Sequence, residues 1–414
     1  MQFNHIINQD KQPVPILSSP KELTYRAYDE IISVIGSENI VTFLPLWESN
    51  GVFKDLLKQH ITFTGSNFTY NRVDGVLHEV PQFNGGTSKI TQVPETQATV
   101  DNANQTLVAP THIATQTLGG LSAEVGFIRL KLKRVGNPTG NVHLEIRNAK
   151  DGTAVTNGVS QSLAVTNIET SAVYKGFVFS QAPKLQKNVT YYIALVYEDG
   201  AIIDGSNHIA WHYDSTGSYG KGSAIYNGGW MEYSGRDFAF DLYANDIVLD
   251  GDFTMIALAQ LDDKVSLATR NVISGTGMTD VGVVGLQYSA IGTIAARAND
   301  LSSARAAHWY RHPSTWQALA YTYDADAIAE KVKLFSNGYK VAVADGVSGT
   351  VGNPTKRLAQ PLTIGSLTTT SGLISEVFAG KISSVIIVKR ALSVQEIGQV
   401  SQILLSQRKR MGAL

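Results

Sequence analysis

Most of the chain consists of short runs in which apolar and polar residues alternate, with turn-forming residues between the runs. Val125 to Lys133, Val142 to Arg147 and Asp237 to Tyr243 alternate in this way, and Val189 to Tyr197 is rich in aromatic and β-branched residues. Alternation with a period of two places successive side chains on opposite faces of a half-buried strand. Asn337-Gly338 is a hairpin signal between two further runs. The pattern therefore predicts an all-β protein.

Helical periodicity is found near the two ends of the chain. Ser19-Pro20-Lys21-Glu22 has the spacing of a capping box with proline at the first helical position, and it predicts a helix over about 20–35. Ser393 and Glu396 form a second capping box, which predicts a helix over about 393–410. Four apolar residues of this second helix recur at helical spacing and should dock on a sandwich face or on a neighbouring chain: Ile397, Val400, Ile403 and Leu404.

The most specific stretch of the chain is residues 361–397, which read PLTIGSLTTTSGLISEVFAGKISSVIIVKRALSVQEI. An apolar strand ends at Ile364-Gly365-Ser366, Phe378-Ala379-Gly380 opens an alternating strand, and Arg390-Ala391-Leu392-Ser393 stops it. This succession closely resembles the closing signature of concanavalin A-like, laminin-G-like jelly-roll domains. The resemblance implies a family that mostly binds glycans or builds extracellular and virion structures, and that only sometimes catalyses.

Other segments resemble further strands of the same domain, but they are far apart in the sequence. These segments are 40–48, 80–90, 251–258, 316–323 and 333–338. The strand at 251–258 should follow 80–90 closely, and it does not. Insertion at an exposed hairpin is tolerated, because ends that lie close together let the inserted segment fold by itself. We therefore expect one sandwich split between 38–97 and 246–392, with an insert over 100–245.

The insert has a β pattern of its own, and its order of strands and turns resembles a small jelly-roll module. Such modules are frequent in phage virion proteins and are related to carbohydrate-binding modules. The predicted fold class is all-β: a concanavalin A-like β-sandwich interrupted by a second β-sandwich, the jelly-roll insert, with short N- and C-terminal helices. An N-terminal arm and helix occupy 1–37, and a C-terminal helix and tail occupy 393–414. Whether the arm packs on its own domain or on a neighbouring subunit stays open.

Composition narrows the setting in which this protein works. Charged residues are 17% and the formal net charge is −1, so no basic field indicates nucleic-acid or anionic-membrane binding. The absence of cysteine excludes disulfides and thiolate metal sites. The start, Met1 to His5, lacks the pattern of a signal peptide, and no apolar run approaches the ~20 residues of a membrane span. Arg408-Lys409-Arg410, at the end of the second helix, is expected to complement the helix dipole.

The densest group of aromatic residues lies in a Gly- and Ser-rich stretch of the insert. Aromatic faces stack on sugar rings, and neighbouring polar groups can orient sugar hydroxyls. The alternative is that the tryptophans and some of the tyrosines are packing residues of the jelly roll. The candidate glycan-binding residues are Trp211, Tyr213, Asp214, Tyr219, Tyr226 and Trp230.

The sequence offers little for catalysis or for a cofactor. Hydrolases of the concanavalin A-like fold often carry an E-x-D-x-(x)-E run along one strand, and this chain has none. The side chains of His308 to His312 alternate between two faces, so they cannot converge on one substrate. We predict no enzyme activity and no cofactor. A structural calcium ion at the rim of the sandwich stays open, with Asp262, Asp263, Asp280 and Asp324 as candidate ligands against their commoner role as turn formers.

These observations favour a structural bacteriophage virion protein, placed at a tail tip, fibre or baseplate or as a capsid decoration. It would be made in the host cytoplasm, contact other virion proteins and copies of itself, and present its sandwiches to host surface glycans. Weak single sites would gain strength from many copies on one particle. The alternatives are a cellular lectin or adhesin module and a polysaccharide depolymerase.

Overall fold

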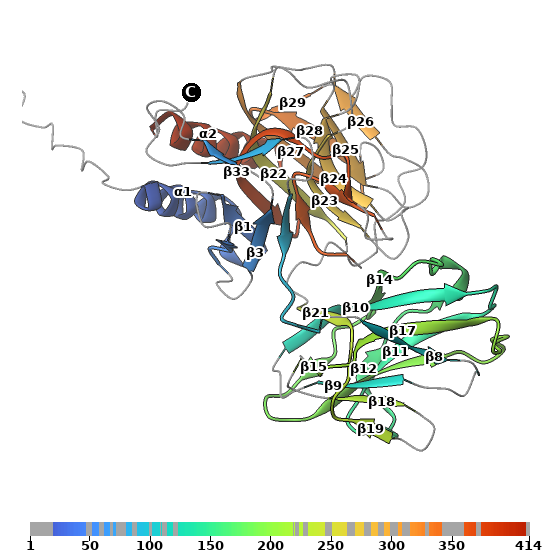
Figure 1. Cartoon of the computed structure of the whole chain (residues 1–414). Coiled ribbons are helices and arrows are strands. Elements are labelled where there is room, and N and C mark those ends of the chain that lie inside the picture. The colour runs from blue at the N-terminus through green and yellow to red at the C-terminus, as the bar shows by residue number, and fades with distance from the viewer. Residues whose placement is uncertain are drawn as a thin grey trace, which may run out of the picture.

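The structure is a computed structural model, and it describes residues 20–46, 52–57, 62–66, 69–71, 80–84, 89–98, 102–107, 109, 114–118, 123–217, 219, 223–226, 231–244, 251–262, 270–276, 283–288, 294–298, 305–308, 315–327, 331–341, 360–369 and 374–410. In these residues the fold is all-β, with two α-helices, α1 (Pro20–Ile35) and α2 (Val394–Arg410), near the ends (Figure 1). Of two short 3-10 turns, η1 (Ser37–Asn39) links α1 to the strand that begins at Ile40, and η2 (Val165–Asn167) links two later strands. The predicted fold class is confirmed.

The first sandwich consists of two sheets that share one apolar core. One sheet has the order β29 (Tyr339–Lys340), β28 (Val332–Ser336), β27 (Trp316–Tyr323), β22 (Phe253–Leu261), β33 (Ala379–Val388), β5 (Val80–Asn84), β4 (Thr69–Asn71), and β1 (Ile40–Pro45) also pairs with β33. The facing sheet has the order β2 (Val52–Lys54), β3 (Thr62–Ser66), β6 (Lys89–Gln92), β30 (Thr363–Ile364), β23 (Arg270–Thr276), β24 (Val283–Tyr288), β25 (Ile294–Ala298), β26 (Arg305–His308). A small ribbon, β31 (Leu367–Thr368) and β32 (Ile374–Ser375), follows β30.

The second sandwich is formed by the strands between β6 and β22, and it has its own apolar core. One sheet has the order β20 (Asp237–Phe238), β17 (His208–Asp214), β10 (Ala123–Val135), β21 (Phe240–Ala244), β7 (Thr96–Ala98); β14 (Val173–Val178) and β15 (Lys184–Leu185) pair with β10, and β8 (Ala103–Leu107) pairs with β17. The other has the order β12 (Ala154–Val159), β11 (Asn141–Arg147), β16 (Tyr191–Tyr197), β9 (Ala114–Leu118), β18 (Ala224–Tyr226), β19 (Met231–Tyr233), with β13 (Leu163–Ala164) on β11. That the inserted second sandwich folds by itself stays a prediction.

Strand β22 is buried on both of its faces, which explains why its sequence does not alternate. Met255 and Ala257 belong to the core between the two sheets, while Ile256 and Leu258 belong to a separate core under the helices. A strand with two covered faces reads as a continuous apolar run. The helices are therefore part of the fold of the first sandwich.

Helices α1 and α2 lie side by side on this outer face of the first sandwich (Figure 1). Ile31 and Ile35 of α1 pack in one apolar cluster with residues of α2 and of β22. In α2, the buried members are Ile397, Val400 and Leu404, and Ile403 is partly buried against them. Of the two expected docking places, α2 thus occupies a sandwich face of its own chain.

Arg408 is enclosed near the end of α2, which was not expected of a residue in a basic cluster. Its side chain is fully buried, and its guanidinium carbon lies 4.3 Å from the centre of the Trp316 ring. Burial lowers the pKa of Arg408 to about 10. Arg408 thus fills space between α2 and β27, beyond any interaction with the helix dipole.

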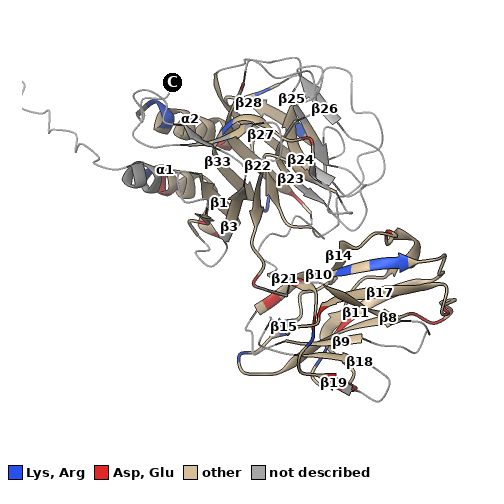
Figure 2. Cartoon of the chain, viewed as in Figure 1, with Lys and Arg blue, Asp and Glu red and all other residues tan. Residues whose placement is uncertain are grey.

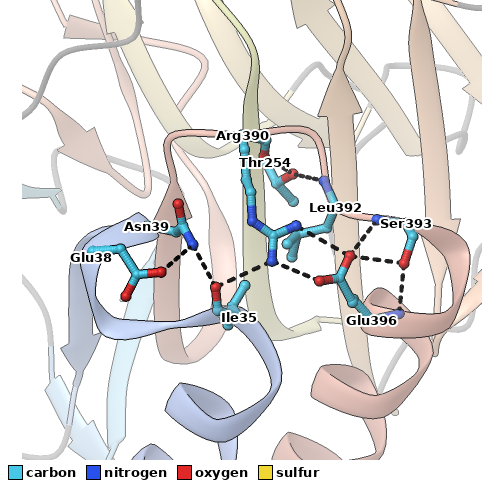
Figure 3. A network of polar contacts seen from close by, with 8 residues as sticks. All are labelled: Ile35, Glu38, Asn39, Thr254, Arg390, Leu392, Ser393 and Glu396. Carbon is cyan, nitrogen blue, oxygen red and sulfur yellow. Dashed lines mark hydrogen bonds and ion pairs between the residues drawn. The ribbon is translucent and has the colours of Figure 1, made fainter.

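A polar network ties the end of α1 to the start of α2 (Figure 3). Ser393 and Glu396 form the predicted capping box: the Ser393 amide donates to Glu396 Oε2 at 2.8 Å, and the Glu396 amide donates to Ser393 Oγ at 3.3 Å. Arg390 donates to Glu396 Oε1 at 2.6 Å and to the carbonyl of Ile35 at 3.1 Å. Arg390 therefore joins the end of α1 to the first turn of α2, and the R-A-L-S signature has a structural role.

Two glycines of the closing signature occupy positions that no other residue fits. Gly365 has φ +80°, and a Cβ there would lie 2.2 Å from the Phe83 ring. Gly380 has φ +146°, and its Cβ would lie 2.1 Å from the carbonyl oxygen of Gln260. Both positive φ values and both close approaches require glycine. These two glycines of the signature therefore allow close contacts between strands that are distant in the sequence.

A buried junction connects the two sandwiches. Arg129 of β10 donates to Gln360 Oε1 at 3.0 Å and to the Tyr243 hydroxyl at 2.9 Å, and it forms an ion pair with Asp241. Gln360, which precedes β30, also donates to the Tyr174 carbonyl at 3.3 Å. The rings of Phe127 and Tyr243 stack at 4.5 Å within the core cluster of the first sandwich. We refer to these contacts as the junction.

Candidate functional site

The structure separates the predicted aromatic residues into core and surface. Trp211 of β17 is fully buried, stacks on Phe238 at 4.2 Å, and donates from Nε1 to the Ala239 carbonyl at 2.9 Å. Its ring faces and its N–H are therefore used inside the second sandwich. The expectation that Trp211 offers a face to a sugar is wrong, and its packing alternative holds.

Asp214 and Tyr219 are also engaged within the fold. Asp214 is fully buried, and its Oδ1 accepts from the Thr216 amide at 2.8 Å and from Thr216 Oγ1 at 2.6 Å. Tyr219 is partly exposed, with its ring edge-on to Phe240 at 5.3 Å. Asp214 thus shapes a turn and does not orient a sugar hydroxyl. The side chain of Tyr226, on β18, and the whole of Trp230 lie outside the described residues.

Tyr213 is the candidate that lies in a partly exposed group, which we call the tyrosine–arginine cluster: Tyr213, Tyr233 and Arg236. The guanidinium carbon of Arg236 lies 5.2 Å from the centre of the Tyr213 ring and 4.4 Å from that of Tyr233. Distances below about 6 Å indicate cation–π attraction. One guanidinium therefore bridges two tyrosine rings at the surface of the second sandwich.

The core and a tight turn hold the tyrosine–arginine cluster in place. Tyr213 packs edge-on against the buried Phe238 at 6.0 Å. The Arg236 amide donates to the Tyr233 carbonyl at 3.0 Å, and the Arg236 carbonyl accepts from the Ala224 amide at 2.7 Å. The turn between β19 and β20 thus fixes the backbone of Tyr233 and Arg236. A backbone held in this way lowers the entropy cost of binding a ligand.

A second polar group lies on β11, where the alternation of the sequence directs three side chains away from the core. We call His143, Glu145 and Arg147, with Glu198, the β11 polar face. His143 Nε2 lies 3.0 Å from Glu145 Oε1, and His143 Nδ1 lies 3.4 Å from Glu198 Oε1. Arg147 donates from Nε to Glu145 Oε2 at 2.7 Å. Ser162 Oγ donates to Glu198 Oε1, and Asn141 Nδ2 donates to Glu198 Oε2 at 3.1 Å.

The charges of the β11 polar face stabilise one another. The hydrogen bond to Glu145 raises the pKa of His143, and the same bond, with that from Arg147, lowers the pKa of Glu145. The hydrogen bond from Ser162 lowers the pKa of Glu198. Both carboxylates are therefore held in the ionised form, as acceptors with partners already in place.

The described residues give no support to a metal site. Among them, no group of three or more His, Cys, Asp and Glu side chains lies close enough to hold an ion. Asp324 Oδ1 accepts from the Ala327 amide at 3.1 Å, as a turn former does. Asp262 also lies next to a strand end, and Asp263 and Asp280 lie outside the described residues. Of the run His308 to His312, only the backbone of His308, on β26, is described.

Sequence reasoning did not identify Arg236 or the β11 polar face. Arg236 stands in Ser234-Gly235-Arg236, and this short glycine turn after an aromatic strand was the available signal. The alternating polar residues of 141–147 were visible in the sequence. Their partner Glu198, however, lies directly after β16, which is distant in the sequence. Pairing between strands, which the sequence does not state, creates both groups.

Comparisons with known proteins support the fold. Residues 235–398 match the family model described as the concanavalin A-like lectin/glucanases superfamily. No curated protein sequence matches the chain. Within the described residues, neither helix has the length and apolar character needed to cross a membrane.

Several solved structures are similar to part of the chain. The Ruminococcus gnavus IT-sialidase CBM40 is 16% identical, with 37% of this chain and 84% of that chain covered and a TM-score of 0.31. The native heptameric SAP-like pentraxin from Limulus polyphemus is 15% identical, with 37% and 70% covered and a TM-score of 0.30. The leech intramolecular trans-sialidase is 18% identical with a TM-score of 0.29; 36% of this chain and 23% of that chain are covered. The assignment therefore rests on the family match and the sheets described above: this is an all-β chain whose residues 235–398 match the concanavalin A-like lectin/glucanases superfamily.

Proposed function

We propose that the protein is a non-enzymatic glycan-binding protein and that the tyrosine–arginine cluster of the second sandwich contacts the sugar. The observation that carries this proposal is the geometry of Tyr213 and Tyr233, two partly exposed rings bridged by one guanidinium at 5.2 and 4.4 Å. Tyrosine combines an apolar ring face with a hydroxyl that donates and accepts, which suits a sugar ring and its hydroxyls. The match of residues 235–398, most of which lie in the first sandwich, to a lectin and glucanase superfamily agrees with glycan binding by the chain, although it includes neither Tyr213 nor Tyr233.

The charge states of the described carboxylates favour binding over hydrolysis. A glycoside hydrolase needs one carboxylic acid with a raised pKa and a second carboxylate facing it. Glu145 and Glu198 have lowered pKa values and already accept hydrogen bonds. Burial raises the pKa of Asp237 and of Asp241. Asp237 already accepts hydrogen bonds from Gln116 and from the Tyr219 amide, and Asp241 is paired with Arg129 inside the junction. A depolymerase is thus the weaker interpretation of these residues.

The family match favours a lectin or adhesin over a purely architectural role. Placement on a virion stays a prediction drawn from the resemblance of the insert to phage modules. The buried apolar residues of α2, for which a neighbouring chain was the other expected docking place, pack against their own chain, together with Ile31 and Ile35 of α1. Glycan binding is compatible with a protein on a cell surface and with a protein on a virus particle.

A glycan array probed with the fluorescently labelled full chain tests this function. Binding to a defined set of oligosaccharides is expected, and Tyr213→Ala and Tyr233→Ala should each weaken it by about 2- to 10-fold, the range of one aromatic contact. The matched control is Tyr339→Ala, because Tyr339 is 77% exposed in a hairpin of the first sandwich. Equal loss in the control, or no binding to any glycan, would contradict the proposal.

A further inference from the structure

Among the described residues of the second sandwich, Arg236 is the arginine whose guanidinium donates to no oxygen. Arg129 pairs with Asp241, Arg147 pairs with Glu145, and Arg134 donates to the Ile168 carbonyl at 3.0 Å. No oxygen among the described residues accepts from the guanidinium of Arg236, whose contacts are the two tyrosine rings. With respect to the described part of the chain, its five N–H donors are thus available to solvent or to a ligand.

The carboxylates nearest to Arg236 in the sequence are directed elsewhere. Asp237 is buried, and its oxygens accept from Gln116 Nε2 at 3.1 Å and from the Tyr219 amide at 3.0 Å. Glu232 is exposed on β19, one residue from Tyr233, and neighbouring residues of a strand point to opposite faces. The positive charge of Arg236 is thus not neutralised from within its own turn.

The guanidinium of Arg236 lies within cation–π distance of both tyrosine rings, and this double contact restricts the position of the guanidinium. A planar guanidinium binds a carboxylate through two parallel N–H···O bonds, and a fixed orientation reduces the entropy lost on binding. Two tyrosine hydroxyls stand in the same cluster and can bind the neighbouring hydroxyls of a sugar. The arrangement suits a sugar that carries a carboxylate more than a neutral sugar.

We infer that the tyrosine–arginine cluster selects glycans that bear a carboxylate, with Arg236 binding the carboxylate and Tyr213 and Tyr233 flanking the sugar. This inference rests on the proposed glycan-binding function and names its ligand class. Hexuronic acids and sialic acids both supply such a carboxylate, and sulfated sugars supply a tetrahedral anion instead. The experiment separates these sources.

The test is calorimetric titration of the full chain with trigalacturonate, 3′-sialyllactose, lactose and a sulfated lactose, together with the methyl ester of each acid. At least one acid is expected to bind roughly 10- to 100-fold more tightly than its ester, as a charge-assisted hydrogen bond predicts. Arg236→Gln should abolish this difference and leave the melting temperature unchanged. Arg236→Lys should retain only part of it, because an ammonium lacks the planar fork.

The matched control is Lys184→Gln, which removes one positive charge from an exposed position of the same sandwich. It should leave the preference intact, which excludes a general effect of net charge. Three results would overturn the inference: equal binding of acid and ester, a preference for the sulfated sugar alone, or a preference that survives Arg236→Gln. In each case the proposed glycan binding itself would stand. Binding of none of the sugars, with none on the glycan array, would overturn the proposed function as well.

Discussion

Arg129 and Gln360 are joined by a hydrogen bond of 3.0 Å between the two sandwiches, although they are far apart in the sequence. Arg129 belongs to β10, which carries a row of basic residues (Figure 2). In this row, Arg129 is paired with a buried carboxylate, Asp241, and its guanidinium carbon lies 5.0 and 5.2 Å from the ring centres of Tyr174 and Tyr243. A buried polar contact of this kind fixes one orientation of its partners, because a shifted arrangement leaves the groups unsatisfied.

The junction predicts that the two sandwiches unfold together. Arg129→Met should leave Asp241 buried without its charge partner and cost about 3–5 kcal/mol, while Gln360→Ala should cost about 1 kcal/mol. Urea unfolding followed by near-UV circular dichroism would show one transition in the wild type and two in Arg129→Met. Lys133→Met, on the same strand, is the control and should keep one transition. Two transitions in the wild type would show that the junction does not couple the sandwiches.

The capping network of α2 predicts a dependence of stability on acid pH. Hydrogen bonds from Arg390 lower the pKa of Glu396 to about 2. A carboxyl group with a lowered folded pKa contributes stability above its unfolded pKa, and the contribution is lost as the pH falls toward the folded pKa. Glu396→Gln should therefore cost about 1 kcal/mol at pH 7 and progressively less from pH 4.5 to about 2. Urea midpoints of both proteins across this range check the prediction, and a constant difference would contradict it.

The β11 polar face predicts a dependence in the opposite direction. The hydrogen bond to Glu145 raises the pKa of His143, and Glu198 and Arg147 are the other charged groups of this face. A histidine with a raised folded pKa contributes stability fully below its unfolded pKa, near 6.5, and loses it as the pH rises through the folded value. The advantage of wild type over His143→Gln should thus be larger at pH 5.5 than at pH 8.5. An NMR titration of the His143 ring gives an independent measure, and a midpoint below 6.5 would refute the assignment.

Much of the fold could be predicted because the closing signature contains glycines at positions where the backbone conformation and the space exclude other residues. Gly365 and Gly380 are required by close contacts with Phe83 and with Gln260. Asn337 and Gly338, with φ of 51° and 86°, form the expected hairpin turn. Such positions tolerate few residues, so they are readable in a single sequence. The continuous apolar run of β22 indicates a strand with two covered faces, but it does not show that helices from both ends of the chain cover the second face.

The candidate site was less predictable for a physical reason. The density of aromatic residues shows that a segment buries or displays rings, but it does not show which ring faces which way. Trp211 faces inward because β17 pairs with β10, where Leu132 is its partner. Arg236 gains its role from Tyr213, which comes from another strand. Site residues that depend on pairing between strands require the structure.

The contrast between Trp211 and Tyr213, only two residues apart on β17, gives the last prediction. Trp211 is a core residue, so Trp211→Ala should cost about 3–5 kcal/mol of stability, the range for a large buried aromatic side chain. Tyr213 is partly exposed, so Tyr213→Ala should change stability by only about 1 kcal/mol and weaken glycan binding instead. Thermal unfolding and glycan titration of the same two variants separate the roles. Trp211→Phe, which keeps an aromatic ring in the core, is the control and should bind glycan like the wild type. If Trp211→Phe lost binding at full stability, the sugar would contact Trp211, and the partition between core and surface residues would be wrong.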